Sequence, residues 1–443
     1  MSDAEERTYR VEMMTRVEGE GSFTLRVKDG EVVDAELAIF EAPRFFEAFL
    51  RGRSPADTVD IVARICGICP VAYQMSASMA FERAAGVEVP AEIAALKRLL
   101  YCGEWIESHV LHVFMLHAPD FLGYPSAVEM AADHRDVVES GLRQKKAGNR
   151  ILEVLGGRAT HPVSPRPGGF YKAPRKKDLE ALLPMLEAGL EESVEAVRWT
   201  AGLDIPAFEQ DYVFVSLSGD AYPLEAGTSI AVSGPGGAPM PDGSRRREVP
   251  LDAWGDEMEE HHVERSNALQ ARLKDGTPYL CGPMARLHHH AEKLHPTAAE
   301  VMAEVGLPRT VLNPYRSIVV RAVETVHAFA EAVDLVKGYE APARGFVDTE
   351  PRSAVGCGAT EAPRGLLWHR YAVDADGLIE EARIVPPTSQ NQARIEDDLR
   401  GLAPELLSLD HAAATHRCEQ LIRAYDPCIS CATHFLDLRI ERG

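Results

Sequence analysis

Long apolar runs, internal repeats and low-complexity linkers are all missing from this sequence. No apolar run reaches the length needed to span a bilayer, and the N-terminal residues 1–6 are acidic and polar rather than a signal peptide. Basic residues are also in short supply, since 47 lysines and arginines stand against 68 acidic residues, for a net charge of −21. This balance disfavours nucleic acid or an anionic membrane surface as the main partner, and we expect a cytoplasmic protein.

Cysteine is scarce as well, with eight residues in a chain of 443. Such a low content does not fit a disulfide scaffold, and in a cytoplasmic protein it favours metal binding or catalysis. Four of the cysteines form two Cys-x-x-Cys pairs. The other four are scattered, and we expect them to be buried as small apolar side chains: Cys102, Cys281, Cys357 and Cys418.

The two cysteine pairs lie near opposite ends of the chain, at Cys66 and Cys69 and at Cys428 and Cys431. Together they supply four thiolates, enough for a tetrahedral zinc, an iron–sulfur cluster or a thiolate-ligated nickel. A small zinc ribbon keeps its halves roughly 15–20 residues apart. Here more than 350 residues separate the pairs. The whole chain must fold before this site exists, which indicates that the metal serves the function of the fold.

Alternating apolar residues predict two β hairpins. The first spans residues 7–40, where apolar residues from Phe23 to Val27 alternate with polar ones and a turn is expected at 28–31. The second is expected over 366–386, again around a short turn. Both hairpins are predicted to flank a much larger helical part.

Helix starts and helical periodicity predict most of the remaining structure. Ser54 followed by Pro55 and Asp57 is typical of a helix start, and this helix is expected to be broken at Gly67 and Pro70. Further helices are predicted over residues 71–117, 176–202, 296–340 and 396–425. The expected fold is therefore α+β and mainly α, a single large domain over 1–443 with a helical-bundle core.

Two glycine- and proline-rich stretches are predicted to be irregular. Residues 123–170 are expected to form a tight loop region without a phosphate-binding G-x-G-x-x-G pattern, and residues 228–250 a surface excursion or hairpin. The histidines at 288–290 are expected to form a solvated or incidental cluster. His109 and His112 share a helix face, and we interpret them as core histidines with backbone partners rather than metal ligands.

Polar residues near the second cysteine pair argue against a structural zinc, which is otherwise the commonest site of this kind. Asp426 and His434 flank the pair on either side. The segment Gly358–Gly365 is similar to a loop that presents one arginine, Arg364, from a constrained turn. A structural zinc needs none of these groups, whereas a redox metal site that moves protons and electrons does.

Together these motifs resemble the large, catalytic subunit of nickel–iron hydrogenases, and the resemblance implies the fold of that subunit. Two cysteine pairs in this context, with the sequence Ala362-Pro363-Arg364-Gly365, are highly specific. The family motifs recur along nearly the whole chain, at Arg16–Gly19, Arg64–Cys69, Ser108–His109 with Asp120, Gly156–Arg158, Glu259–Val263, Glu361–Gly365 and Asp426–His434.

The resemblance implies that all four cysteines bind nickel and that the second of each pair also bridges to iron. Cys66 and Cys428 are then terminal nickel ligands, and Cys69 and Cys431 are bridging ligands. Soft thiolates suit nickel, and bridging sulfurs keep two metals close together. The iron is expected to carry carbon monoxide and two cyanide ligands.

The same resemblance assigns the residues around the metals. Arg364 is expected over the open coordination side, with Pro363 and Thr388 packed around the diatomic ligands. Asp120 and Asp426 are expected to complete the charged environment of Arg364.

Proton transfer and a third metal are also implied. Glu18 is expected to be the first proton relay, which takes the proton of H2 from the thiolate of Cys428. Magnesium is expected on Glu47 and His434, with a backbone carbonyl near residues 383–384.

One departure from the family pattern indicates a subgroup. Family members often have histidine four residues after the second cysteine of the first pair, where this chain has Tyr73. Together with the compact length and the segment Val385–Asn391, this is similar to cytoplasmic NADP-linked hydrogenases, the sulfhydrogenase alpha subunits among them. The resemblance implies an iron–sulfur small subunit, flavin- and NAD(P)-binding reductase and iron–sulfur subunits, and a chaperone. It also implies a maturation protease that removes residues 435–443, with retention of this tail as the alternative.

The predicted reaction is reversible heterolytic cleavage of H2. The alternatives are an H2-sensing regulatory subunit, a relative of the quinone-site subunit of respiratory complex I, and a zinc scaffold. The complex I subunit has lost the nickel cysteines, whereas this chain keeps all four. H2 sensors tend to lack a C-terminal tail, whereas residues 435–443 form one here.

Overall fold

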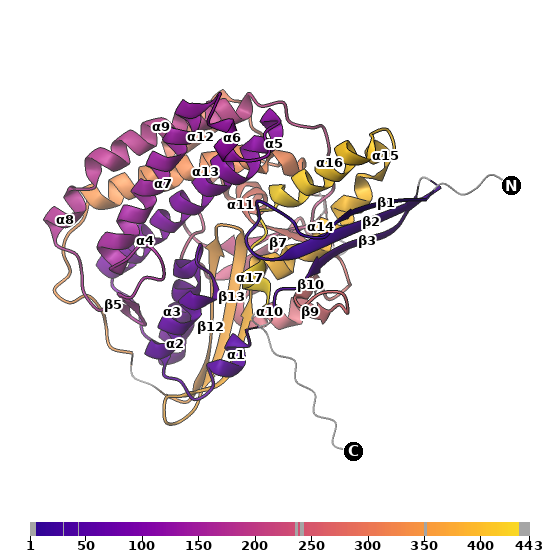
Figure 1. Ribbon diagram of the computed structural model, residues 1–443. Coiled ribbons are helices and arrows are strands. Elements are labelled where there is room, and N and C mark those ends of the chain that lie inside the picture. The colour runs from indigo at the N-terminus through magenta and orange to yellow at the C-terminus, as the bar shows by residue number, and fades with distance from the viewer. Residues whose placement is uncertain are drawn as a thin grey trace, which may run out of the picture.

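The computed structural model describes residues 6–29, 31–42, 44–234, 238–239, 243–349 and 352–433. His434 and the tail 435–443, for which magnesium binding and cleavage are predicted, lie outside these ranges. Figure 1 shows the helices α4 (Ala91–Val110), α7 (Arg135–Gly156), α9 (Leu183–Ala201) and α13 (Ser317–Lys337) gathered in one layer, a sheet of the N-terminal strands at the opposite edge, and a long hairpin in the centre. Among the described helices, none combines the length and apolarity needed to cross a membrane.

The helical layer confirms the predicted bundle. α4 packs against α7 and α13, and α13 packs against α9. A Cβ atom on Gly148 of α7 would lie 2.7 Å from the carbonyl oxygen of Gly103 of α4. Glycine therefore allows these two helices to approach closely. Shorter helices join the layer: α5 (Ala118–Leu122), α6 (Ala127–Met130), α8 (Lys176–Glu180) and α12 (Pro296–Glu304).

Two predictions about this layer were wrong. The helix expected over 71–117 is interrupted, because α3 (Pro70–Ala85) ends at Gly86 with a φ of 67°, and α4 continues into a π-helix, Leu111–His117. The loop region expected over 123–170 contains the whole of α7. Buried residues recur in α7 every three or four positions, which places one face on the bundle, and this periodicity outweighs the glycines.

The first predicted hairpin is confirmed as part of a three-stranded antiparallel sheet. Its strands are β1 (Glu6–Val11), β2 (Gly21–Lys28) and β3 (Glu31–Ile39). The side chains of Phe23, Leu25 and Val27 are buried, as the alternation predicts.

The second predicted hairpin is confirmed as β13 (Gly365–Val373) and β14 (Ile379–Val385), but a third strand precedes it. β12 (Ala354–Ala362) was expected to be partly loop, and it pairs with β13 over its full length. β12 packs against α3, and a Cβ atom on Gly356 would lie 1.9 Å from the carbonyl oxygen of Ala80. Its glycines therefore indicate close packing against a helix rather than a loop.

The stretch 228–250 forms the predicted hairpin, with β7 (Ser229–Ser233) antiparallel to β8 (Arg246–Pro250). The histidines 288–290 end α11 (Pro283–His290), and of the predicted solvated or incidental cluster the solvated alternative was wrong, because His289 and His290 are buried. His289 hydrogen-bonds Ser216 of the neighbouring strand. Further short strands are β4 (Pro165–Arg166), β5 (Gly169–Phe170), β6 (Phe214–Ser218), β9 (Met258–His262), β10 (Leu269–Leu273) and β11 (Leu280–Cys281).

The C-terminal helices return to the N-terminal strands. α14 (Pro387–Gly401) packs against β3, β10 and α17 (Ile429–Ala432), and α16 (His411–Ala424) packs against β1. The N-terminal strands and the C-terminal helices thus pack against each other. The remaining helices are α1 (Phe46–Phe49), α2 (Pro55–Val62), α10 (Trp254–Glu257) and α15 (Ala403–Leu406).

Candidate metal centre

The first cysteine pair lies in a short turn between two helices. Ser54 caps α2 by accepting a hydrogen bond from the backbone N–H of Asp57, as predicted. After α2, the chain makes one 3-10 turn, Ala63–Ile65, and becomes extended at Cys66. Pro70 starts α3 rather than ending a helix, because proline fits the first helical turn. The turn brings Cys66 Sγ within 3.3 Å of the backbone nitrogen of Cys69.

The second pair lies between α16 and the end of the described chain. Thr388 at the start of α14 accepts a hydrogen bond of 2.9 Å from the backbone N–H of Cys428, and Cys431 follows within α17. Asp426 adopts a φ of 55°, which turns the chain sharply between the two helices. These features fix the direction in which the second pair faces.

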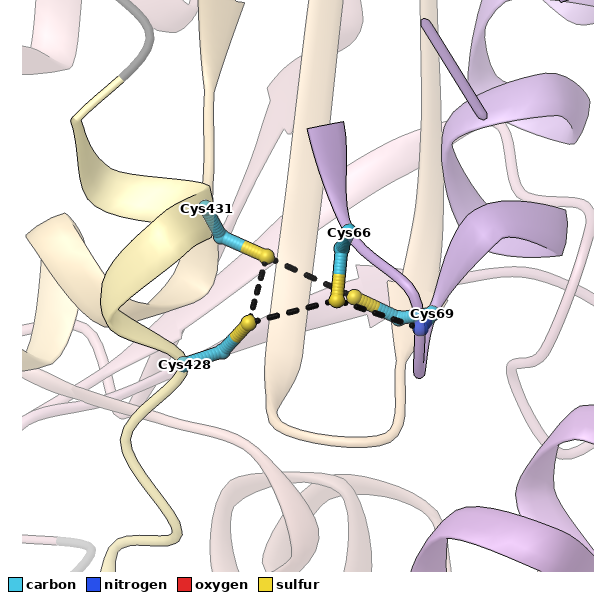
Figure 2. A group of neighbouring side chains, drawn as sticks. All are labelled: Cys66, Cys69, Cys428 and Cys431. Carbon is cyan, nitrogen blue, oxygen red and sulfur yellow. Dashed lines mark hydrogen bonds between the residues drawn. The ribbon is translucent and has the colours of Figure 1, made fainter. Parts of the chain in front are cut away.

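The four cysteine sulfurs form one buried cluster, as Figure 2 shows. All four lie within 4.8 Å of one another, with 3.3 Å between the sulfurs of Cys66 and Cys428 and 3.4 Å between those of Cys69 and Cys431. The predicted convergence of the two pairs is therefore confirmed. In contrast, the four scattered cysteines are buried elsewhere as free thiols, which is also as predicted.

The electrostatics of the cluster fit a bound cation. Burial raises the pKa of the Cys428 thiol, and hydrogen bonds with the other three cysteines raise it further. Burial also opposes ionisation of Cys66, but hydrogen bonds with its neighbours and the charge of Arg364 hold the pKa of Cys66 well below its usual value. Four thiolates cannot share so small a volume without a compensating positive charge. Soft, clustered sulfur donors of this kind fit a thiolate-bound transition metal.

Glu18 touches the cluster directly. Its carboxylate Oε2 lies 3.1 Å from Cys428 Sγ and accepts a hydrogen bond of 3.0 Å from the backbone N–H of Ser430. The Ser430 hydroxyl in turn donates to Glu41 Oε1 at 3.1 Å. Gly19, with a φ of 90°, allows this approach, since a Cβ atom there would lie 2.6 Å from Ile429 Cβ. Glu18 therefore stands between the buried sulfurs and a second, half-buried carboxylate.

Arg364 reaches the cluster from the tip of the central hairpin. Pro363 and Arg364 form the two-residue turn between β12 and β13. The guanidinium donates from Nε to the Asp426 carbonyl oxygen at 2.7 Å and pairs through Nη2 with Asp426 Oδ1 at 3.1 Å. Burial lowers the pKa of Arg364, but the Asp426 carboxylate and the cysteine sulfurs outweigh it and raise that pKa well above its usual value. The guanidinium is therefore a permanent positive charge beside the sulfurs.

Asp120 is placed differently from the prediction. It accepts hydrogen bonds from Arg16 and, at 3.0 Å, from Arg423. The second side chain that contacts Arg364 is Ser108, whose Oγ lies 3.5 Å from Nη1. Asp120 lies beyond the π-helix that follows α4, whereas Ser108 lies within α4 and faces the hairpin. The adjacent Ser108–His109 motif was noticed in the sequence, but its serine was given no role.

Glu47 lies near the segment predicted to share its magnesium ion. Its Oε1 accepts a hydrogen bond of 2.6 Å from the backbone N–H of Ile384. The strand β14 and α1 are in contact, which brings these residues together. The third expected ligand, His434, lies outside the described residues.

Two buried residues at the centre were missed by sequence analysis or given no role. Glu104 of α4 accepts hydrogen bonds from the backbone N–H groups of Val71 and Ala72, at 2.6 and 3.0 Å, and so caps α3 directly after Cys69. Tyr73 is fully buried, and burial and the charges of Cys431 and Cys69 raise the pKa of its hydroxyl well above its usual value. No sequence pattern marks Glu104, because its partners lie more than thirty residues away. Tyr73 was noticed only as a departure from a family motif.

Comparison with known proteins matches this chain to the family of nickel-dependent hydrogenases, over residues 44–141 and 271–434. These ranges include all four cysteines of the cluster. The chain is 32% identical to sulfhydrogenase 1 subunit alpha of Pyrococcus furiosus, over 97% of this chain and 98% of the relative. It is 33% identical to sulfhydrogenase 2 subunit alpha of the same organism, over 96% and 98%.

Among solved structures, a chain of an NAD+-reducing [NiFe]-hydrogenase in the H2-reduced state is similar, with a TM-score of 0.84 and 27% identity. That match covers 98% of this chain and 100% of the other. A [NiFeSe]-hydrogenase chain of Dm. baculatum, 23% identical with a TM-score of 0.77, shares the fold. The α+β, mainly helical fold is thus that of the hydrogenase large subunit. The chain belongs to the nickel-dependent hydrogenases, as a large, catalytic subunit of an oxidoreductase that acts on hydrogen.

Proposed function

We propose that Cys66, Cys69, Cys428 and Cys431 hold a nickel–iron centre at which this subunit splits H2 reversibly. The observation that carries the proposal is the buried four-sulfur cluster, with sulfurs within 4.8 Å of one another, flanked by one carboxylate and one guanidinium. When bound, the metal pair supplies the site at which H2 is polarised and cleaved heterolytically. We assign Cys66 and Cys428 to nickel alone and Cys69 and Cys431 to both metals.

The side chains around the cluster supply proton transfer and charge. The proton released from H2 passes through Cys428 Sγ to Glu18 Oε2, which lies 3.1 Å away and is held in place by the backbone of Ser430. Arg364, oriented by Asp426, provides a fixed positive charge over the sulfurs, where it stabilises the separation of charge as H2 is cleaved. Pro363 and Thr388 line the space expected for carbon monoxide and two cyanide ligands on the iron.

Each H2 yields two protons and two electrons, so the reaction needs an electron acceptor. We propose an iron–sulfur small subunit as the first acceptor, and flavin-containing subunits that reduce NAD(P) beyond it. The support comes from the similarity to sulfhydrogenase alpha subunits and to a chain of an NAD+-reducing enzyme. The same similarity supports a cytoplasmic location, a single large-subunit domain over 1–443, and a protease and chaperone that act on residues 435–443 during maturation.

Magnesium is the third metal in the proposal. Glu47 supplies one oxygen, and a backbone carbonyl near Ile384 is proposed as a second ligand, which the hydrogen bond between Glu47 and the Ile384 N–H supports. His434 is proposed as the remaining protein ligand.

An infrared spectrum of the anaerobically purified complex, with nickel, iron, zinc and magnesium analysis, tests the proposed centre. We expect stretching bands of carbon monoxide and cyanide together with one nickel and one iron per chain. Zinc at the cysteines without those bands, in protein made with its maturation machinery, contradicts the proposal.

A further inference from the structure

A second buried arginine, Arg286, lies behind the hairpin tip that carries Arg364. Arg286 is fully buried in α11 and has Glu324 of α13 and Glu361 of β12 as ion-pair partners. Its guanidinium also lies 4.4 Å from the ring centroid of Trp105. A buried ion pair contributes little net stability on average, so this arrangement is weak evidence for a role in folding alone.

Every N–H group of the Arg286 guanidinium has an acceptor. Nε and Nη2 donate to the two carboxylate oxygens of Glu324, both at 2.7 Å. Nη1 donates to Glu361 Oε2 at 2.9 Å and to the carbonyl oxygen of Ala362 at 3.1 Å. The remaining N–H of Nη2 donates to the carbonyl oxygen of Pro363 at 3.1 Å. A guanidinium has five such donors in a fixed plane, so the five bonds are compatible with one orientation only.

Two of these five bonds end on the residues directly before Arg364. The carbonyl of Pro363 belongs to the same peptide group as the nitrogen of Arg364, and the indole N–H of Trp105 donates to the carbonyl two residues before it, that of Glu361, at 2.9 Å. Cys281 packs closely against the other side of the turn, because a Cβ atom on Gly365 would lie only 2.6 Å from Cys281 Sγ. The backbone at Arg364 is therefore held from both sides.

From these contacts we infer that Arg286 is a positioning residue, which sets where the Arg364 guanidinium lies over the sulfur cluster. Glu324 holds Arg286 in a fixed position relative to α13. Arg286 in turn holds the hairpin tip in place through hydrogen bonds to the carbonyls of Ala362 and Pro363. The inference rests on the proposed role of Arg364. It adds a specific dependence of that role on a residue that does not touch the metal site.

The test compares Arg286→Lys with a matched control in the assembled, matured complex. Lysine keeps the charge but cannot make five bonds in one plane. The control is Arg98→Lys. Arg98 also makes a two-pronged pair with a glutamate of α13, Glu331, and donates to a backbone carbonyl, that of Tyr222, but its hydrogen bonds and ion pairs go to Glu331, Glu225 and Tyr222 rather than to residues 361–364.

We expect Arg286→Lys to retain nickel and iron, to shift the infrared bands of the diatomic ligands and to lower kcat about 10- to 100-fold, since catalytic groups displaced by about 1 Å lose that much. Arg98→Lys should leave the bands and kcat as in the unmodified complex. The inference is overturned if Arg286→Lys leaves both unchanged, or if the two variants change them equally.

A double-mutant comparison separates positioning from general structural damage. If Arg286 acts through Arg364, the double variant Arg286→Lys/Arg364→Lys should have the kcat of Arg364→Lys alone. Multiplied losses overturn the inference. If Arg286→Lys fails to assemble, Glu324→Gln takes its place, because glutamine has the size of glutamate but binds Arg286 more weakly. We expect Glu324→Gln to shift the infrared bands in the same direction by a smaller amount. Unchanged bands in Glu324→Gln overturn the inference.

Failure of the underlying proposal gives a different pattern. If the unmodified complex lacks diatomic bands, the proposed centre is wrong. If Arg364→Lys alone keeps full turnover, the proposed role of Arg364 is wrong. If both hold as proposed and only Arg286→Lys is without effect, the positioning role alone is refuted.

Discussion

The carboxylate of Glu18 lies 3.1 Å from the sulfur of Cys428, although 410 residues separate them in the chain. The contact exists because the backbone of Glu18 pairs with the segment that begins α17, where Ile429 N–H donates to the Glu18 carbonyl oxygen at 2.9 Å. A proton on that sulfur therefore has an acceptor at hydrogen-bond distance. The same pairing joins the segment between β1 and β2 to the start of α17 beside the sulfur cluster.

Glu18→Gln is expected to block proton transfer while the metals stay bound. Glutamine has the same shape and can still accept from the Ser430 N–H, but it cannot take up the proton of Cys428. General acid–base groups typically contribute about 100- to 10,000-fold, so exchange between H2 and D2O should fall by at least about 100-fold. Normal exchange in a variant with full nickel and iron content contradicts the relay role.

Arg364→Lys is expected to reduce turnover by at least about 100-fold, because the loss of one preorganised charge donor typically costs that much. Lysine cannot reproduce the paired contacts of Nε and Nη2 with Asp426. Metal content and infrared bands establish that the centre is assembled before kcat is compared. Near-normal turnover in an assembled variant shows that Arg364 has no role in the reaction.

Asp120→Asn is expected to change thermal stability but not kcat, and Ser108→Ala to change kcat but not thermal stability. Asp120 pairs with Arg16 and Arg423, and removal of a partner from a buried ion pair costs about 3 kcal/mol. The Asn variant should therefore unfold at lower temperature, with kcat per bound nickel close to the original. Ser108 contacts Arg364, so Ser108→Ala should change kcat with little change in thermal stability. If Asp120→Asn lowers kcat while the unfolding temperature stays unchanged, Asp120 takes part in the reaction.

Glu47→Gln is expected to lower the magnesium content of the purified complex and to leave nickel and iron in place. The amide can still accept from the Ile384 N–H, but it is a much weaker ligand for a hard divalent cation. Elemental analysis after dialysis against buffer without magnesium measures the effect. Glu381→Gln is a matched control, because Glu381 lies on the strand β14 that carries Ile384 but is exposed, and this variant should retain the ion. Equal magnesium in both variants argues against a ligand at Glu47.

His290 is expected to make the subunit less stable in mild acid. Burial, with the nearby charges of Arg246 and Lys293, lowers the pKa of His290 to about 4. The unfolded chain, with an ordinary histidine pKa of about 6.5, binds the proton first, so stability falls as pH drops below about 6.5. Between pH 7 and pH 5 the titration of this one group lowers the free energy of unfolding by about 2 kcal/mol, because each pH unit between the two pKa values contributes about 1.4 kcal/mol.

His290→Gln removes that titration. Glutamine can still donate to the carbonyl oxygen of Leu217, which the His290 Nε2 contacts at 2.9 Å. The difference in unfolding temperature between pH 7 and pH 5 should therefore be smaller in the variant. An identical difference in both proteins shows that His290 does not contribute to acid sensitivity.

Several features of the fold were predictable because they depend on neighbours in sequence. Ser54 caps its helix, Pro55 occupies the first helical turn, and Phe23 and Val27 alternate into a sheet core, all within a few residues of their partners. Where the predictions failed, tertiary packing decided the outcome. Gly356 lies in a strand because α3 passes directly above it, and His289 and His290 are buried because α11 packs against β6.

By itself, the sequence determined the main functional residues of this protein. They are the two Cys-x-x-Cys pairs, Arg364 in its turn and Glu18, and each belongs to a local motif. Only the tertiary structure decided which side chains surround the metals. Ser108 rather than Asp120 contacts Arg364, Glu104 caps the helix behind Cys69, and Arg286 holds the hairpin tip. These contacts join helices and strands that are distant along the chain. No local pattern specifies them, because their geometry follows from how the elements pack.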